Sequence, residues 1–142
     1  PALIDSMTEI RRVLDDQTAI AMQPVLAEFM ESGHFAAHIR RMRTLYAERQ
    51  QVLIAAVREH LDGVLDVEPD EAGMHLIGDI APHPHIKDTD LAAKAAAAGL
   101  TVYPLSRFYL GTAKRNGILL GYAGLEARDI RAGIAKLAKA LG

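Results

Sequence analysis

The amino-acid sequence predicts an α/β fold, an α+β sandwich in which about four strands form a sheet covered by helices, preceded by a helical lead-in. Two patterns carry this prediction. Apolar residues recur at helical spacing over residues 2–61, whereas short apolar runs alternate with turn residues and helical stretches over residues 64–142. The chain of 142 residues has the size of one domain, and with 50% hydrophobic and 24% charged residues it can bury a core.

Three helices are predicted first. One spans residues 2–15, with this apolar face: Leu3, Ile4, Met7, Ile10 and Leu14. After a polar break at residues 15–18, a second helix runs to Ser32 and ends at Gly33. The third covers residues 34–61 and carries one apolar stripe: Phe35, Ile39, Met42, Tyr46, Leu53, Val57 and Leu61.

Strands and shorter helices follow. Residues 64–68 and 74–80 predict two strands of a hairpin, joined by a turn at residues 69–73. A stiff loop, Pro82-His83-Pro84-His85, comes next. We expect Asp88 or Thr89 to cap a helix that ends at Ala98 and Gly99.

The last part predicts two more strands and a final helix. Residues 100–104 and 117–122 are the strands, and residues 126–141 form a helix with one apolar face: Ile130, Ile134, Leu137 and Leu141. We expect a boundary after residue 33, with residues 1–33 as a helical lead-in from a larger domain and residues 34–142 as a small C-terminal domain.

Composition excludes several classes of function. The chain has no cysteine, so it can form neither a disulfide nor a thiolate metal site. Its net charge of −2 disfavours a dedicated nucleic-acid-binding domain, and the basic cluster Arg40, Arg41 and Arg43 is interpreted as the solvated face of a helix. No apolar run is long enough to span a membrane and no signal peptide opens the chain. These features predict a cytoplasmic protein.

The six histidines do not predict a metal site. His34 and His38 share a helix face, but the residues between them lack the glutamate of a zinc-protease motif, and no third ligand is near. His83 and His85 lie on the predicted loop. His75 is expected to be a core or inter-strand residue.

Arg107 is the best candidate for binding a ligand. It follows a predicted strand next to Pro104, and a guanidinium presents a planar fork of donors that matches a carboxylate. The alternative is an ordinary solvated arginine. The neighbouring loop, residues 111–117, joins two strands and is expected to be a flexible connection rather than a phosphate loop. Ser106 has no histidine and acid nearby to form a catalytic triad.

Several blocks in fixed order resemble one family, the MocR-type transcriptional regulators of the GntR family. The blocks are LAEFMESG (residues 26–33), HIRRMR (38–43) followed by Tyr46 and Arg49, AGMHL (72–76), YPLSRFYL (103–110) and LGYAGL (120–125). The resemblance covers essentially the whole chain and points to the C-terminal part of the aminotransferase-like domain.

This resemblance implies a fold-type-I aminotransferase fold that uses pyridoxal 5'-phosphate. In the family, a winged helix-turn-helix binds DNA and a large domain carries the lysine that holds the cofactor. Both would precede the point that matches Pro1. We therefore expect the full-length protein to bind the cofactor and to form a homodimer, and this fragment alone to lack stable cofactor binding and activity.

The resemblance also assigns roles to individual residues. Arg107 matches the arginine that grips the carboxylate of a small amino-compound effector. Ordinary aminotransferases of this fold place such an arginine in the last strand, where this chain has Leu119, so Arg107, or second Arg115, would have to bind the carboxylate. The departure favours an effector-sensing module over an enzyme. Two alternatives stay open: the C-terminal domain of a genuine aminotransferase, and an interaction domain with no ligand.

Overall fold

The computed structural model describes residues 3–15, 20–71, 73–81 and 86–142. Most of the predicted break at residues 15–18 and the whole of the loop at residues 82–85 lie outside these ranges. The chain divides into two compact units, Pro1–Met42 and Arg43–Gly142. None of the described helices is both long enough and apolar enough to cross a membrane.

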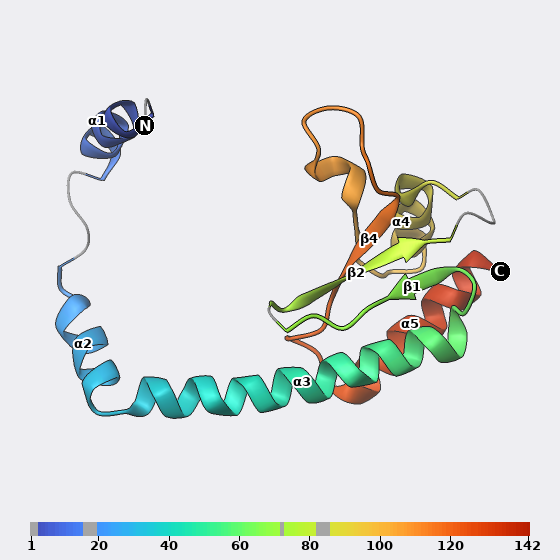
Figure 1. Cartoon of the computed structure of the whole chain (residues 1–142), viewed down its shortest axis with the longest axis horizontal. Coiled ribbons are helices and arrows are strands. Elements are labelled where there is room, and N and C mark those ends of the chain that lie inside the picture. The colour runs from blue at the N-terminus through green and yellow to red at the C-terminus, as the bar shows by residue number, and fades with distance from the viewer. Residues whose placement is uncertain (1–2, 16–19, 72, 82–85) are drawn as a thin grey trace. The chain divides into compact units, whose positions relative to one another are not determined.

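The first unit is helical, as predicted. It contains α1 (Ile4–Leu14), α2 (Gln23–Glu31) and the first turns of α3 (His34–His60), which continues into the second unit (Figure 1). Neither α1 nor α2 has a buried residue. The apolar residues that predicted α1 are therefore exposed, and periodicity alone located this helix.

A sharp turn joins α2 to α3 at Gly33, whose φ of +79° favours glycine. The ring of Phe29 stacks on His34 with centroids 6.3 Å apart, and it meets Phe35 edge-on at 6.2 Å. The ring of Phe29 therefore covers one face of the His34 ring.

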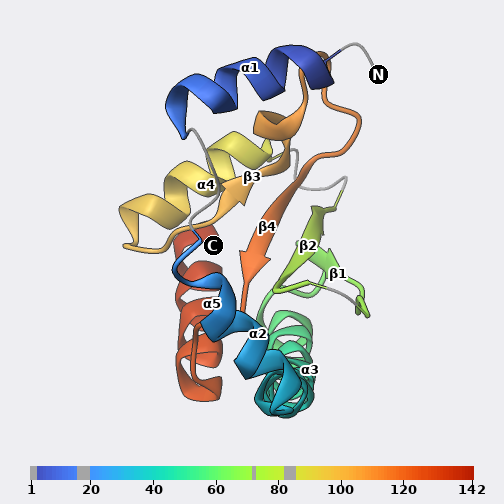
Figure 2. The same ribbon diagram turned by 90° about the vertical axis from the view of Figure 1, so that its left-hand side faces the viewer.

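The second unit contains one antiparallel sheet with strand order β1-β2-β4-β3. Its strands are β1 (Leu65–Val67), β2 (His75–Ile80), β3 (Tyr103–Pro104) and β4 (Gly117–Gly121). The predicted hairpin of β1 and β2 is confirmed. The central pair β2 and β4 comes from segments far apart in the sequence, which lie side by side in both views (Figures 1 and 2).

Strand β3 is shorter than predicted. The N–H of Leu100 donates to the carbonyl of Ala95, 2.9 Å away, so the chain is still closing helix α4 (Asp88–Ala97) at this point. Only Tyr103 and Pro104 then pair with β4. Gly99, with φ +69°, ends α4 as predicted.

The two faces of the sheet differ. Leu76, Ile118 and Leu120 are buried in one core with residues from α3, α4 and α5 (Ala127–Leu141). That core consists of Leu53, Ile54, Ala56, Val57, Leu61, Leu65, Val67, Leu76, Ile80, Leu91, Ala95, Ile118, Leu120, Tyr122, Ile130, Ile134 and Leu137. On the other face, residues such as Leu119 are only half-buried and His75 is exposed. His75 is therefore not a core residue, because its position in β2 turns it away from the helices.

Polar contacts tie α3 to the ends of the strands. The side-chain amide of Gln50 donates to the carbonyl of Asp70 at 2.8 Å and to the Tyr122 hydroxyl at 3.2 Å, and that hydroxyl donates to the carbonyl of Gly73. Arg49 donates to the carbonyl of Ala123 and, at 2.9 Å, to Glu126. Arg49, Gly73, Tyr122 and Ala123 belong to the blocks that carry the family resemblance, and these contacts give them a structural role.

Candidate functional site

Arg107 lies in a short 3₁₀ helix, η1 (Leu105–Phe108), directly after β3. Its side chain is exposed and forms no hydrogen bond or ion pair with another described residue. It lines a cavity of about 280 Å³ between η1, the preceding strand and α4, to which α4 contributes Thr89, Ala92, Ala93 and Ala96. The guanidinium fork is therefore available to a ligand.

A buried carboxylate binds the residue that directly precedes Arg107. Asp88 is only 4% exposed. Its Oδ2 accepts a hydrogen bond from the Ser106 N–H at 2.7 Å, and its Oδ1 accepts one from the Ser106 hydroxyl at 2.9 Å. Leu105, on the other side of Ser106, is buried. The residues before Arg107 are thus anchored twice.

Neither Asp88 nor Thr89 is the N-cap of α4, which corrects the sequence prediction. The N-cap of α4 is Lys87, without a side-chain cap hydrogen bond, and the Asp88 carboxylate is already occupied by Ser106. Asn116 serves the helix start instead: its Oδ1 accepts from the Asp88 N–H and its Nδ2 donates to the carbonyl of Ile86, both at 2.8 Å.

Arg115 is in a different situation. Its Nε and Nη2 donate to the two carboxylate oxygens of Asp79, at 3.0 and 2.5 Å. The hydrogen bond to Asp79, followed by the charge of the same carboxylate, raises the pKa of Arg115 above its usual value. The fork of Arg115 stays charged but is already paired.

The two candidate arginines line different cavities. Arg115 borders a cavity of about 300 Å³ that is otherwise lined by Ile77, Leu105, Phe108, Tyr109 and Leu119. Leu119 supplies an apolar side chain on the sheet face opposite the core. The structure therefore does not bring Arg107 and Arg115 together around one ligand.

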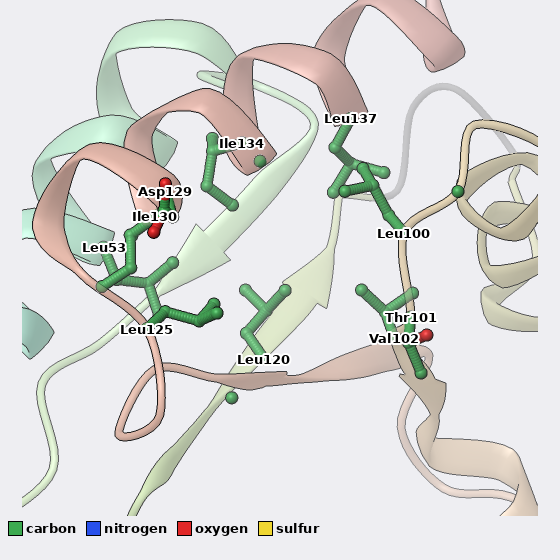
Figure 3. A pocket seen from close by; sticks show the side chains of 13 residues that line it. Leu53, Leu100, Thr101, Val102, Leu120, Leu125, Asp129, Ile130, Ile134 and Leu137 are labelled. Carbon is green, nitrogen blue, oxygen red and sulfur yellow. The ribbon is translucent and has the colours of Figure 1, made fainter.

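A third cavity, also about 300 Å³, lies between α5 and the strands (Figure 3). Leu120, Ile130 and Ile134 extend into it in this view, and Asp129 is its one charged lining residue. It has no cationic group, so it does not suit an anion.

The other candidates show no arrangement for chemistry. The Ser106 hydroxyl donates to Asp88 and not to a histidine. Nδ1 of His38 lies 3.4 Å from Nη2 of Arg41. Within the described ranges, no three His, Asp or Glu side chains could hold a metal ion. His83 and His85 lie outside those ranges.

Sequence reasoning missed Asp88 and Asn116 as parts of this site. Asp88 and Ser106 are 18 residues apart, and Asn116 and Asp88 are 28 apart. Local patterns carry no signal for such pairs, since ordinary cap and loop residues have the same identities.

Known proteins resemble the chain in sequence. The probable rhizopine catabolism regulatory protein MocR of Rhizobium meliloti is 36% identical over 140 residues, which are 99% of this chain and 28% of that protein. The HTH-type transcriptional regulator YhdI of Bacillus subtilis is 32% identical over 96% of this chain and 29% of its own length. Aromatic-amino-acid aminotransferase 1 of Thermococcus litoralis is 27% identical over 99% of this chain and 33% of its own length. No family model matches the chain.

Solved structures share the fold. LysN, the α-aminoadipate aminotransferase of Thermus thermophilus, superposes with a TM-score of 0.82 at 20% identity, over 99% of this chain and 36% of LysN. The kynurenine aminotransferase of Pyrococcus horikoshii gives 0.82 at 22% identity, over 99% of this chain and 34% of that enzyme.

The chain spans less than a third of the curated regulators it matches. The matched segment is the C-terminal region of these proteins, and its fold is that of the C-terminal domain of fold-type-I aminotransferases. Over nearly its whole length, the chain is thus similar to the C-terminal, aminotransferase-like part of MocR-type regulators of the GntR family.

Proposed function

We propose that this chain is the carboxylate-binding part of an effector-sensing domain in a transcriptional regulator. Arg107 binds the carboxylate of a small amino compound. The observation that carries the proposal is the combination of an unpaired guanidinium at the edge of a cavity with an anchored backbone. Because the backbone next to Arg107 is already fixed, less conformational entropy is lost when its guanidinium binds a carboxylate.

Arg115 is the weaker candidate because Asp79 already occupies its fork. A ligand carboxylate would have to displace a bidentate partner that is covalently part of the same chain. Arg107 has no such competitor among the described residues.

The remainder of the proposed function belongs to the longer protein. LysN was solved in complex with N-(5'-phosphopyridoxyl)-L-leucine, an adduct of the cofactor with an amino acid, on the fold that this chain shares. The curated regulators that the chain matches are more than three times its length. For the full-length regulator we therefore propose cofactor binding, the amine-binding half of the site, DNA binding through an N-terminal domain and homodimer formation.

A genuine aminotransferase is the second candidate function, and the similarity to the Thermococcus enzyme favours it. The half-buried Leu119 on the open sheet face weighs against it, because an apolar side chain there offers no charge to a substrate carboxylate. A multiple-turnover assay of the full-length protein with an amino donor and a keto acid separates the two. Sustained turnover would support the enzyme.

The carboxylate role is tested by matched probes on the full-length protein with pyridoxal 5'-phosphate. Affinities are measured by calorimetry for glycine, β-alanine and 4-aminobutyrate, each against the amine that lacks its carboxylate: methylamine, ethylamine and propylamine. In wild type at least one amino acid should bind more tightly than its amine.

Arg107→Ala should abolish this preference, with a loss of about 10- to 100-fold for a hydrogen bond to a charged group. Arg107→Lys should recover part of it, because the charge returns without the fork. Arg115→Ala is the matched control and should keep the preference. An unchanged preference in Arg107→Ala would refute the role of Arg107.

A further inference from the structure

The buried carboxylate of Asp88 serves neither the core nor an ion pair. Gln50 and Asp88 are the buried polar side chains of the described residues, and Gln50 ties α3 to the strand ends. Asp88 pairs with no cation among those residues. Burying a carboxylate is costly unless hydrogen bonds compensate, and here the carboxylate accepts two hydrogen bonds from Ser106.

Both hydrogen bonds act on the residue directly before Arg107. The Ser106 N–H fixes the peptide that joins it to buried Leu105, and the hydroxyl fixes the side chain. The carbonyl of Ser106 in turn accepts from the Tyr109 N–H at 3.4 Å, which closes the turn around Arg107. The turn that carries Arg107 is thus tied to the first residue of α4 through Asp88.

Asp88 is itself held in place. Its N–H donates to Asn116, whose side chain also donates to the carbonyl of Ile86. Asn116 directly precedes β4, so the central strand, the start of α4 and η1 meet at Asp88, through its N–H on the side of Asn116 and through its carboxylate on the side of Ser106. Such a junction orients a side chain more accurately than a free loop would.

We propose that Asp88 is a positioning residue for Arg107: it holds η1 so that the guanidinium faces an incoming carboxylate. This inference rests on the proposed function of Arg107 and adds a residue to that site. An apolar residue at position 88 would pack but would leave the Ser106 donors unpaired and the turn free to move.

The test uses the full-length protein with pyridoxal 5'-phosphate and the same three amino acids and matching amines. Asp88→Ala should lower the preference for the carboxylate about tenfold, the scale of one lost charged hydrogen bond, while the affinity for the amine is unchanged. Amide hydrogen exchange at Ser106 should accelerate. Asp88→Asn keeps an acceptor for the N–H and should recover most of the preference. Asp90→Ala removes an exposed carboxylate from the same helical turn and is the control.

The double variant Asp88→Ala with Arg107→Ala decides whether Asp88 acts through Arg107. If it does, the double variant should show the same preference for the amino acid over the amine as Arg107→Ala alone. If Asp88→Ala does not fold, Ser106→Ala removes one of the two donors and should give a smaller loss in the same direction. Two results would overturn this inference alone. In the first, Arg107→Ala loses the preference for the carboxylate while the folded Asp88 or Ser106 variants keep it. In the second, the losses of the two single variants add up in the double variant. An unchanged preference in Arg107→Ala would overturn the proposed function and this inference together.

Discussion

Two arginines eight positions apart differ in what their guanidinium groups already contact. Arg115 forms a fork with Asp79, while Arg107 leaves its donors open at the edge of a cavity. The difference depends on partners and not on residue type. A single carboxylate, placed on β2 across from the start of β4, already occupies the guanidinium of one of the two candidates.

The Asp79–Arg115 pair should contribute little to stability. Both side chains are nearly half exposed, at 46% and 48%, so water screens the pair. Asp79→Ala should change the free energy of unfolding by about 0–1 kcal/mol, measured by urea denaturation at low and high salt. A loss well above this range that salt does not reduce would contradict a surface ion pair.

The raised pKa of Arg115 has a defined consequence for pH. A cation whose pKa is higher in the folded state contributes stability that is complete below its unfolded pKa and is lost as pH rises through the folded value. Both values lie far above neutrality. The guanidinium therefore adds no pH dependence to unfolding in the neutral range.

Gly117 should not tolerate a side chain. A Cβ at this position would lie 2.7 Å from the carbonyl oxygen of Gly78 and 3.1 Å from Leu105, at the junction of β2, β4 and η1. Gly117→Ala should destabilise the protein by about 1–3 kcal/mol in urea denaturation, the usual cost of overpacking. Gly124→Ala, where no heavy atom lies within 4 Å of the added Cβ, is the control and should be close to neutral. Equal stability of the two variants would contradict the close approach.

At the scale of elements, α5 contains a glycine that its packing does not require. Gly133 lies inside the helix, and a Cβ there would meet Leu100 at 4.0 Å, an ordinary contact. Gly133→Ala should raise the free energy of unfolding by about 0.5–1 kcal/mol, because alanine loses less backbone entropy in a helix. Thermal denaturation measures the change, and a lower midpoint than wild type would refute it.

The matched control for the substitution of Gly133 is Gly99, which follows α4 and has a φ of +69°. Gly99→Ala should destabilise the protein by about 1 kcal/mol because an L-residue is strained in this conformation. Opposite signs for these two substitutions would separate the effect of backbone conformation from the effect of added volume.

At the scale of the whole molecule, the core lies entirely within the second unit. Every residue of the buried cluster falls in residues 53–137, whereas α1 and α2 bury none of theirs. Residues 43–142 should therefore fold alone and show a dispersed amide spectrum and a cooperative thermal transition. The helix α1, with 11 residues, should be largely unfolded as an isolated peptide, since short helices are marginal in water. A non-cooperative transition of residues 43–142 would contradict this view.

Circular dichroism of the isolated α1 peptide checks the second half of this prediction. Its exposed apolar residues, among them Met7 and Val13 at 66% and 83% exposure, need burial that this unit does not provide. Strong helicity of the peptide in water would mean that local propensity is sufficient for α1.

The amino-acid sequence by itself determined where the helices lie and what most turns look like. Periodicity located α3 and α5, and Gly99 marked the end of α4, because these features depend on neighbours within one or two turns of the chain. It also supplied the family resemblance and singled out Arg107. The tertiary structure alone decided the strand order, the exposure of His75, the pairing of Arg115 with Asp79 and the junction at Asp88. Each of these depends on which distant segments meet and in which register. A shift of one residue in the pairing of a strand would turn every side chain of that strand to the opposite face of the sheet. That register gives Arg115 its partner, and the contact of α4 with η1 anchors the turn beneath Arg107.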